Sequence, residues 1–211
     1  TNSTTYIGLA GSGTGNINPF QVFNGINIPV IATIIITPTA NGCVGPIISF
    51  NITVNPTPLT NPVFDQTVCN GEVTVQENIS GSALGTTYNW TNDTPSIGLG
   101  ASGADSVPSF TAINNTNAPI TATITISPTA NACAGPQSII HITVNPTPHI
   151  TAITNQILCN GQNTATVNIT GPVSGSTFSW TNSDTTIGLA SSGNGDITSF
   201  TAINNRSEEH T

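Results

Sequence analysis

The chain has 211 residues, of which one is Arg, none is Lys and nine are acidic, so its formal net charge is −8. Charged residues make up 5% of the chain, against about 25% in an ordinary soluble domain. With one basic residue the chain lacks the positive patch that nucleic acid or an anionic membrane requires, so neither is an expected partner.

The sequence shows no pattern of a membrane helix, and no signal peptide is visible in it. The longest apolar stretch, Ile28 to Ile36, is interrupted by Pro29 and Thr33 and is far shorter than the ~20 residues of a spanning helix. No charged start followed by an apolar run marks a signal peptide. The abundance of Thr, Asn, Val, Ile, Gly and Pro favours strands and tight turns throughout.

The expected strands begin at residues 30–36, where every second side chain is Val, Ala or Ile. Residues 73–79 mark another strand, built on two valines and an isoleucine. Tyr88 and Trp90 share strand parity, which predicts an aromatic pair buried by one central strand. Residues 107–113 mark one more strand.

The clearest alternation lies between Ile120 and Ile126, where apolar residues are separated by Thr, the pattern of a half-buried strand. A turn is expected from Pro128 to Pro136, and a closing strand from Ile140 to Val144. Six or seven short strands in about ninety residues predict an all-β fold of antiparallel β-sandwich type. A closed barrel is disfavoured because a proline-rich joint delimits each unit.

The sequence repeats with a period of 90 residues and no insertion. Residues 57–115 and 147–205 share 27 identities in 59 positions, a register that Thr and Asn bias alone would not maintain. The matched positions are Asn55-Pro56-Thr57-Pro58 with Asn145-Pro146-Thr147-Pro148, Cys43 with Cys133, Cys69 with Cys159, Trp90 with Trp180, Ile7-Gly8-Leu9 with Ile97-Gly98-Leu99 and Ile187-Gly188-Leu189, and Phe20 with Phe110 and Phe200.

The period divides the chain into the C-terminal part of a first repeat (1–56), a complete repeat (57–146) and the N-terminal part of a third (147–205). The outer two parts lack opening and closing strands respectively, so we expect both to expose unpaired strand edges. The Asn-Pro-Thr-Pro joints fix an extended backbone and predict semi-rigid spacers between independently folded units.

Residues 206–211 break the repeat register. The codons AGA TCG GAA GAG CAC ACG encode this peptide and match the end of a widely used sequencing adapter. We interpret the six residues as adapter read-through, with a divergent tail as the alternative.

The four cysteines have no C-x-x-C spacing, which gives little support for a metal site. We expect a disulfide between Cys69 and Cys133, which would close a loop within one repeat and stabilise it by about 4 kcal/mol. The partners of Cys43 and Cys159 would then lie outside the sequence. The alternative pairs Cys43 with Cys69 and Cys133 with Cys159. A simple count of seven strands could also place Cys69 and Cys133 at opposite poles, where no bond forms.

No residue pattern indicates catalysis, a cofactor or a metal. His141 and His149 each occur in one copy of the repeat, where Asn51 and Leu59 occupy the matching positions, so both are expected to be exposed structural residues. The carboxylates are scattered, with no calcium loop and no pair suited to hydrolysis. The glycine-rich segments precede no helix and no Lys, so they are expected to be turns rather than phosphate loops.

Two kinds of motif concern glycosylation. Asp105-Ser106-Val107 resembles a bacterial O-glycosylation signal, and Asp184-Thr185-Thr186 fits it loosely, so Ser106 and Thr185 are candidate sites. N-x-[ST] sequons also arise by chance in a chain this rich in Asn and Thr. They begin at Asn51, Asn78, Asn89 and Asn168.

The matched segments together are similar to the PKD-like, immunoglobulin-like tandem repeats of large bacterial cell-surface proteins, such as gliding-motility adhesins exported by type IX secretion. The resemblance covers residues 1–205 and rests on five runs. They are Cys69-Asn70-Gly71, Tyr88-Asn89-Trp90-Thr91-Asn92, Ser109-Phe110-Thr111-Ala112, Thr121-Ala122-Thr123-Ile124-Thr125-Ile126 and Ile142-Thr143-Val144-Asn145-Pro146-Thr147-Pro148.

The resemblance implies an extracellular, non-enzymatic, rod-like stalk or spacer of a surface adhesin. Its expected partners are neighbouring repeats, like chains and surface polysaccharide or other glycans. Two alternatives stay open: a subunit of a self-assembling extracellular fibre, and a carbohydrate-binding accessory module. The carbohydrate-binding module would need an exposed aromatic platform, whereas most of the few aromatic residues fall at core parity.

Overall fold

The computed structural model describes residues 1–204, and the proposed read-through peptide 206–211 lies outside this range. The described chain is all-β, as the sequence predicts, with two short 3₁₀ turns as its only helical elements. We call residues 1–56, 57–146 and 147–204 the first, middle and last segments. The described chain forms two compact units, one of Thr1–Ile113 with Thr121–Thr143 and one of Asn114–Ile120 with residues 144–204.

The elements are short and follow one another closely. The first segment contains β1 (Val30–Ile36), β2 (Thr39–Ala40), β3 (Cys43–Val44) and β4 (Ile48–Val54). The middle segment contains β5 (Gln66–Cys69), β6 (Glu77–Asn78), β7 (Thr87–Asn92), η1 (Pro95–Ile97), β8 (Ser102–Ala104), β9 (Ser106–Val107), β10 (Ile120–Ala130), β11 (Cys133–Ala134) and β12 (Ser138–Asn145). The last segment contains β13 (Ser179–Thr181), η2 (Thr185–Ile187) and β14 (Ser192–Asn194).

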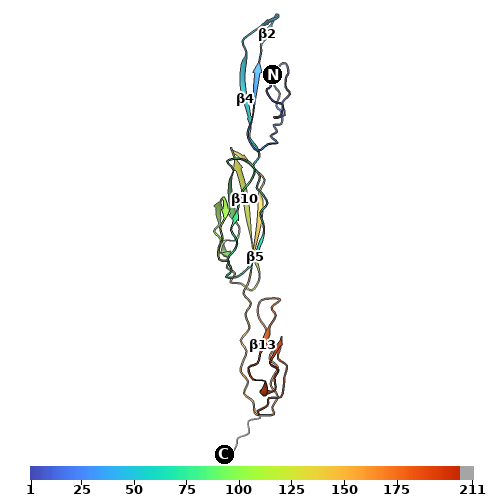
Figure 1. Cartoon of the computed structure of the whole chain (residues 1–211), viewed down its shortest axis with the longest axis vertical. Helices are drawn as coiled ribbons and strands as arrows, with labels where there is room; N and C mark the ends of the chain where they lie inside the picture. Colours follow the sequence, from blue (N-terminus) through green and yellow to red (C-terminus); the bar gives the residue numbers. More distant parts are fainter. Residues whose placement is uncertain (205–211) are drawn as a thin grey trace, which may run out of the picture. The chain divides into compact units, whose positions relative to one another are not determined.

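The middle segment is built on one six-stranded sheet with the order β5-β12-β10-β7-β8, in which β11 also pairs with β10. A second, two-stranded sheet joins β6 to β9. The larger sheet is open, with β5 and β8 at its edges, so it forms no closed barrel. Figure 1 shows β10 running through this segment.

Strand β10 confirms the alternation predicted for residues 120–126. Ile124 and Ile126 are fully buried, whereas Thr123 and Thr125 are half-buried. The strand continues to Ala130 because Pro128 is accommodated opposite Tyr88 of β7. The turn therefore begins later than predicted, at Asn131 and Ala132, which both adopt positive φ.

Strand β12 confirms the predicted closing strand, with Ile140, Ile142 and Val144 all buried. The chain leading to β5 lies alongside it. The Pro58 carbonyl oxygen lies where a side chain on Gly135 would be, and the Asp65 carboxylate accepts the His141 backbone N–H at 2.7 Å. Residues 58–69 consequently run in the same direction as residues 135–145.

The predicted aromatic pair is confirmed as core. Tyr88 and Trp90 on β7 are 6% and 3% exposed. The Trp90 Nε1–H donates to the Ser106 carbonyl at 2.8 Å, so the buried indole leaves no donor unpaired. Gly103 of β8, paired with Trp90, leaves the space that the indole ring occupies.

The strand predicted over residues 73–79 is wrong. Val73 and Val75 are exposed and Thr74 is buried, the reverse of the expected parity. Thr74 faces inward because its N–H donates to the Phe110 carbonyl and its hydroxyl accepts the Phe110 N–H. The Gln66 side chain bonds both the N–H and the carbonyl of Val75 at 2.9 and 2.8 Å, in place of a neighbouring strand. Only β6 and an isolated bridge from Val73 to Thr111 are extended pairings here.

The strand predicted over residues 107–113 is shorter than expected. Only Ser106–Val107 forms a strand, β9, and the chain beyond it pairs through the bridge at Thr111.

The first segment is organised by an antiparallel pair, β1 with β4, in register from Val30 opposite Val54 to Ile36 opposite Ile48. The strand expected at residues 30–36 is thus present. A small core of Ile7, Ala32, Ile34 and Val54 joins the loop preceding β1 to one face of this hairpin. Phe20 and Leu9 are among the partly buried residues packed against it.

The last segment has fewer strands. β13 pairs with β14 from Ser179 opposite Asn194 to Thr181 opposite Ser192. Two isolated bridges, Asn163 to Thr201 and Val167 to Ile197, hold the remaining loops.

We predict that Trp90→Ala destabilises the middle segment by about 3–5 kcal/mol, because it removes a large buried ring from a packed core. Phe64→Ala is the control, since Phe64 is 68% exposed and its loss should change stability by about 0.5 kcal/mol or less. Denaturant unfolding followed by far-UV circular dichroism measures both. Equal unfolding midpoints for the two variants would contradict the core described here.

We predict that Gly98→Ala destabilises the same segment by about 1–3 kcal/mol. Gly98 has φ +101°, and a Cβ there would lie 2.5 Å from the Thr111 carbonyl oxygen. Gly100→Ala is the matched control, because its φ is ordinary and its nearest neighbour would be 4.0 Å away. Thermal unfolding of the two variants should separate them clearly, and a Gly98→Ala chain as stable as Gly100→Ala would refute the constraint.

Candidate functional site

The acidic side chains serve the backbone rather than forming a common site. Of the seven in residues 1–204, six accept a backbone N–H, and no group of three or more His, Cys, Asp or Glu in this range is arranged to hold a metal ion. The donors to Asp65, Glu72, Asp93, Asp105, Asp184 and Asp196 are His141, Cys69, Thr123, Tyr88, Thr186 and Ile169.

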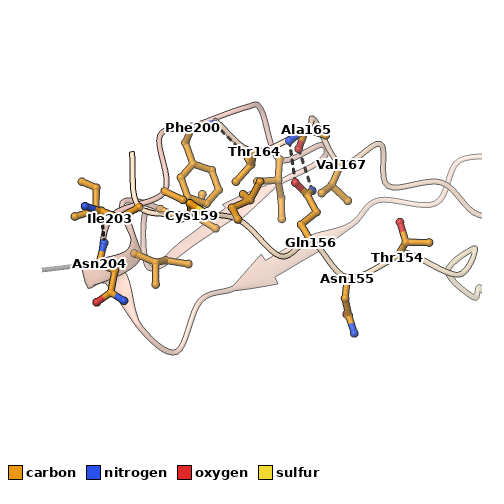
Figure 2. Close-up of a pocket in the computed structure, with 16 residues that line it drawn as sticks. Thr154, Asn155, Gln156, Cys159, Thr164, Ala165, Val167, Phe200, Ile203 and Asn204 are labelled. Atoms are coloured by element: carbon orange, nitrogen blue, oxygen red, sulfur yellow. Dashed lines mark hydrogen bonds between the residues drawn. The ribbon is translucent and has the colours of Figure 1, made fainter. Parts of the chain in front are cut away.

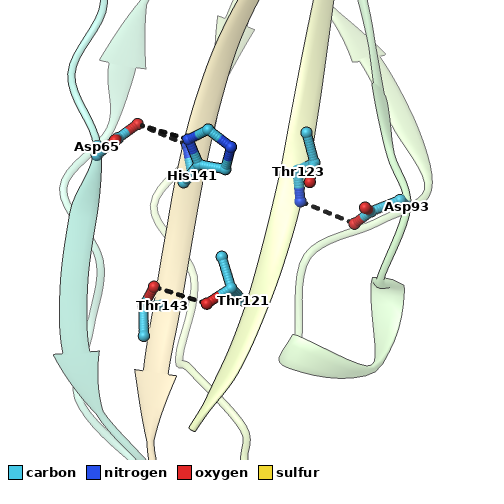
Figure 3. Close-up of polar contacts among 6 residues, drawn as sticks. All are labelled: Asp65, Asp93, Thr121, Thr123, His141 and Thr143. Carbon is cyan, nitrogen blue, oxygen red and sulfur yellow. Dashed lines mark hydrogen bonds and ion pairs between the residues drawn. The ribbon is translucent and has the colours of Figure 1, made fainter.

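The two histidines that the sequence singled out lie apart from any cleft. His141 on β12 is half exposed, and its Nδ1 lies 3.5 Å from the Asp65 carboxylate (Figure 3). His149 is exposed. Among the described residues, no contact joins either imidazole to a Ser, Thr or Cys side chain.

Asp93 fastens the loop after β7 to β10, a role that no sequence motif indicates. Its carboxylate accepts the Thr123 N–H at 2.7 Å (Figure 3). The same carboxylate accepts the Thr94 hydroxyl at 2.8 Å. The pKa of Asp93 is lowered below its ordinary 3.8, mainly by the hydrogen bond from the Thr123 N–H and next by the one from the Thr94 hydroxyl. The matching position in the first segment is Ser3, whose hydroxyl accepts the Thr33 N–H at 2.8 Å.

We predict that Asp93→Asn lowers the melting temperature at pH 7 but not at strongly acidic pH. Because folding depresses the Asp93 pKa, its contribution is fully present above the unfolded value of about 3.9 and is lost as pH falls through the folded pKa. Glu77→Gln is the control, since it removes a carboxylate of β6 that takes no part in the Asp93 contacts with Thr123 and Thr94. Melting curves from pH 7 to pH 2 should converge for wild type and Asp93→Asn. A constant difference down to pH 2 would exclude ionisation as the cause.

The cysteines are all free thiols, and the expected disulfide between Cys69 and Cys133 is absent from the structure. Cys133 follows the β10–β11 turn, at the end of the sheet where Pro58 meets Gly135. Cys69 ends β5 at the other end of the sheet, beside the bond from Gly71 N–H to the Ala112 carbonyl. The two thiols therefore lie at opposite ends of the sheet.

The candidate glycosylation sites differ in accessibility. Ser106 is half-buried in β9, opposite Asn78 of β6, and its carbonyl accepts the Trp90 indole N–H. Thr185 is exposed at the first position of η2. The Thr186 hydroxyl and N–H both donate to Asp184, which lowers the Asp184 pKa. Of the two, Thr185 is the better placed for an enzyme to reach.

An apolar groove of about 460 Å³ opens in the last segment (Figure 2). Its walls come from residues 154–160, from residues 164–167 and from the chain around η2 and after β14. Ile187, Leu189, Ile197 and Phe200 form its apolar floor, and none of its lining residues is Asp, Glu, Lys, Arg or His.

Polar side chains hold the groove walls in place. The Gln156 amide bonds both backbone groups of Ala165, at 2.8 and 3.1 Å (Figure 2). The Thr164 hydroxyl accepts the Phe200 N–H at 3.0 Å. An uncharged, apolar groove with a fixed rim suits an apolar polypeptide surface better than an ionic substrate.

Comparison with protein-family models finds no match for this chain, and comparison with curated proteins finds none either. Within residues 1–204 no helix has the length and apolarity to cross a bilayer.

Proposed function

We propose that the chain is a tandem array of immunoglobulin-like, PKD-like β-sandwiches with a 90-residue repeat, from the stalk or spacer region of a bacterial cell-surface adhesin. In this proposal it has no catalytic activity, needs no cofactor and works outside the cell. Its partners are neighbouring repeats, like chains and surface glycans.

One observation carries the proposal: a loop with the same hydrogen bonds lies at three positions 90 residues apart. The Asn side chain that opens the loop donates to the carbonyl of a Leu seven residues later, at 3.0–3.1 Å in each case. The Gly before that Leu has φ of +90°, +101° and +95° and lies against a backbone carbonyl oxygen. These residues are Asn2, Gly8 and Leu9; Asn92, Gly98 and Leu99; and Asn182, Gly188 and Leu189.

The chemistry of the side chains supports a structural role. Six of the seven acidic side chains in residues 1–204 bond the backbone that positions them, so they act as local clamps. The Gln66 and Gln156 amides clamp the backbone in the same way at matching positions. A surface built from neutral amides and hydroxyls suits a spacer exposed to varying salt, because few ion pairs are available to be screened.

The fibre alternative is favoured by a separate observation. The last segment has an open apolar groove, while the β1–β4 hairpin of the first segment exposes Ile36, Ile48 and Phe50. Two different apolar surfaces on one chain are what a head-to-tail contact between copies would need.

We predict that small-angle X-ray scattering finds an elongated particle in dilute solution. A compact chain of this length has a radius of gyration of about 17 Å. β10 has 11 residues, so one sandwich is about 36 Å long at about 3.3 Å per residue, and three in a row have a radius of gyration of roughly 30 Å. Extrapolation to zero concentration removes association. A value near 17 Å would overturn the stalk proposal.

A further inference from the structure

Five Asn residues of the chain are followed directly by Gly: Asn24, Asn41, Asn70, Asn160 and Asn194. An Asn-Gly pair is chemically reactive, because Gly has no Cβ to keep its backbone nitrogen away from the Asn side chain. Attack of that nitrogen on the side-chain amide carbon closes a five-membered ring. In a folded chain the attack requires that both reacting groups are free to move, and the structure holds the five pairs differently.

In three of the pairs a backbone hydrogen bond holds the attacking nitrogen. The bonds measure 2.8–2.9 Å and join the N–H groups of Gly71, Gly161 and Gly195 to the carbonyls of Ala112, Ala202 and Phe178. At Asn160 the side chain is held as well, since its Oδ1 accepts the Asn204 N–H at 2.8 Å. Each backbone bond has to break before the Gly nitrogen can turn toward the Asn side chain, which slows the reaction.

In the pair at Asn24 the side chain is fixed instead. Its Nδ2 donates to the Ile28 and Val54 carbonyls at 2.9 and 2.7 Å, and its Oδ1 accepts the Ile26 N–H at 2.9 Å. The matching Asn114 bonds two carbonyls of the middle segment in the same way. This Asn therefore has a structural role in the repeat, and its amide carbon is not free to move.

The pair at Asn41 has neither kind of restraint. Asn41 and Gly42 form the two-residue turn between β2 and β3, with φ of 51° and 80°. Both are exposed, and in the described chain no hydrogen bond reaches the Asn41 side chain or the Gly42 N–H. The β2–β3 hairpin consists of two residue pairs whose side chains are all exposed, so its tip opens at little cost.

We propose that Asn41 is a site of spontaneous deamidation and reacts faster than the other four Asn-Gly pairs. The Gly42 nitrogen bonds to the Asn41 Cγ, the Cγ–Nδ2 bond breaks, and the amide leaves as ammonia with the proton from the Gly42 N–H. Solvent water then opens the succinimide at one of its two carbonyls. The product is aspartate or isoaspartate, and its ionised carboxylate adds one negative charge to the turn.

The exposure of this turn belongs to the repeat and not to the first segment alone. In the complete middle segment the matching turn, Asn131 and Ala132, is exposed too, with φ of 49° and 63°. Among the described residues no hydrogen bond reaches the Asn131 side chain or the Ala132 N–H. The Cβ of Ala132 hinders the attack that Gly42 permits. The chain therefore contains a reactive turn and a matched, less reactive one.

The modification should change the tip of the hairpin and leave the core in place. Isoaspartate routes the backbone through the side chain of residue 41, which lengthens a two-residue turn and disturbs the register of β2 with β3. The β1–β4 pairing ends at Ile36 opposite Ile48, outside the turn. The Asn-Pro joints are exempt from this chemistry, because Pro has no N–H to give up.

Incubation of the whole chain in mildly alkaline buffer at 37 °C, with dithiothreitol to keep the cysteines reduced, tests the ranking. Samples are digested with pepsin at acidic pH, and fragmentation mass spectrometry locates deamidation and isoaspartate. A parallel incubation in guanidinium chloride gives the rate of each Asn-Gly pair in the unfolded chain. The ratio of unfolded to folded rate measures how strongly the structure protects each pair.

We expect the smallest ratio at Asn41 and ratios larger by about tenfold or more at the other four pairs, because each of those must first break hydrogen bonds. This comparison uses the wild-type chain and needs no variant to fold. Equal ratios at all five pairs overturn the proposal, and so does an Asn41 that is protected as strongly as Asn24.

Exchanging the two turns gives the matched test. Gly42→Ala copies the turn that the middle segment already tolerates, and it should remove most of the modification at Asn41. Ala132→Gly creates a sixth Asn-Gly pair and should start deamidation at Asn131, while Asn24 stays protected in both variants. Far-UV circular dichroism confirms that each variant folds. Deamidation of Asn41 at the wild-type rate in Gly42→Ala refutes the proposal. An Asn131 that stays intact in folded Ala132→Gly but reacts when that chain is unfolded refutes it too.

Discussion

The burial of one apolar hairpin face is the interaction on which the rest of the structure depends. In the middle segment β10 and β12 together supply Ile124, Ile126, Ile140, Ile142 and Val144, all almost fully buried. β7 adds Tyr88 and Trp90 beside them. Ion pairs contribute almost nothing, since the described residues carry one histidine contact with a carboxylate. The chain thus relies on apolar area and backbone pairing, in which side-chain amides and hydroxyls replace missing strands.

This dependence explains why the three segments differ. Where the hairpin is flanked on both sides, the Ile at the shared register position is buried, as at Ile97. Where a hairpin meets only a loop, half of its face stays exposed, as at Ile36 and Phe50. In the last segment the matching positions form a groove in place of a core. The segments also differ at the matching tryptophans, because the buried Nε1 of Trp180 lacks the carbonyl partner that Trp90 finds at Ser106.

The parts of the fold that sequence predicts well are those with a local cause. Alternation alone placed β10 and β12, and shared parity alone placed Tyr88 and Trp90 in the core. The strand over residues 73–79 failed because its parity is set by a distant partner: Thr74 bonds Phe110, and Gln66 caps Val75. The hydrogen bond between Asp93 and Thr123 could not be predicted from the sequence for the same reason, since it joins positions 30 residues apart. The groove lies in the last segment at positions where the sequence has no alternation or motif that marks its shape or its lining.

The direction in which residues 58–69 run beside β12 has a mechanical consequence. The chain enters the middle segment near Pro58, at one end of β12, and leaves it after Asn145, at the other. Tension applied through these two points would pull β5 and β12 lengthwise past each other. The hydrogen bonds between the two strands would then bear the load at the same time. In a hairpin pulled apart from its open end, they break one after another. A segment pulled in this shear geometry unfolds at a higher force than one whose first and last strands separate bond by bond.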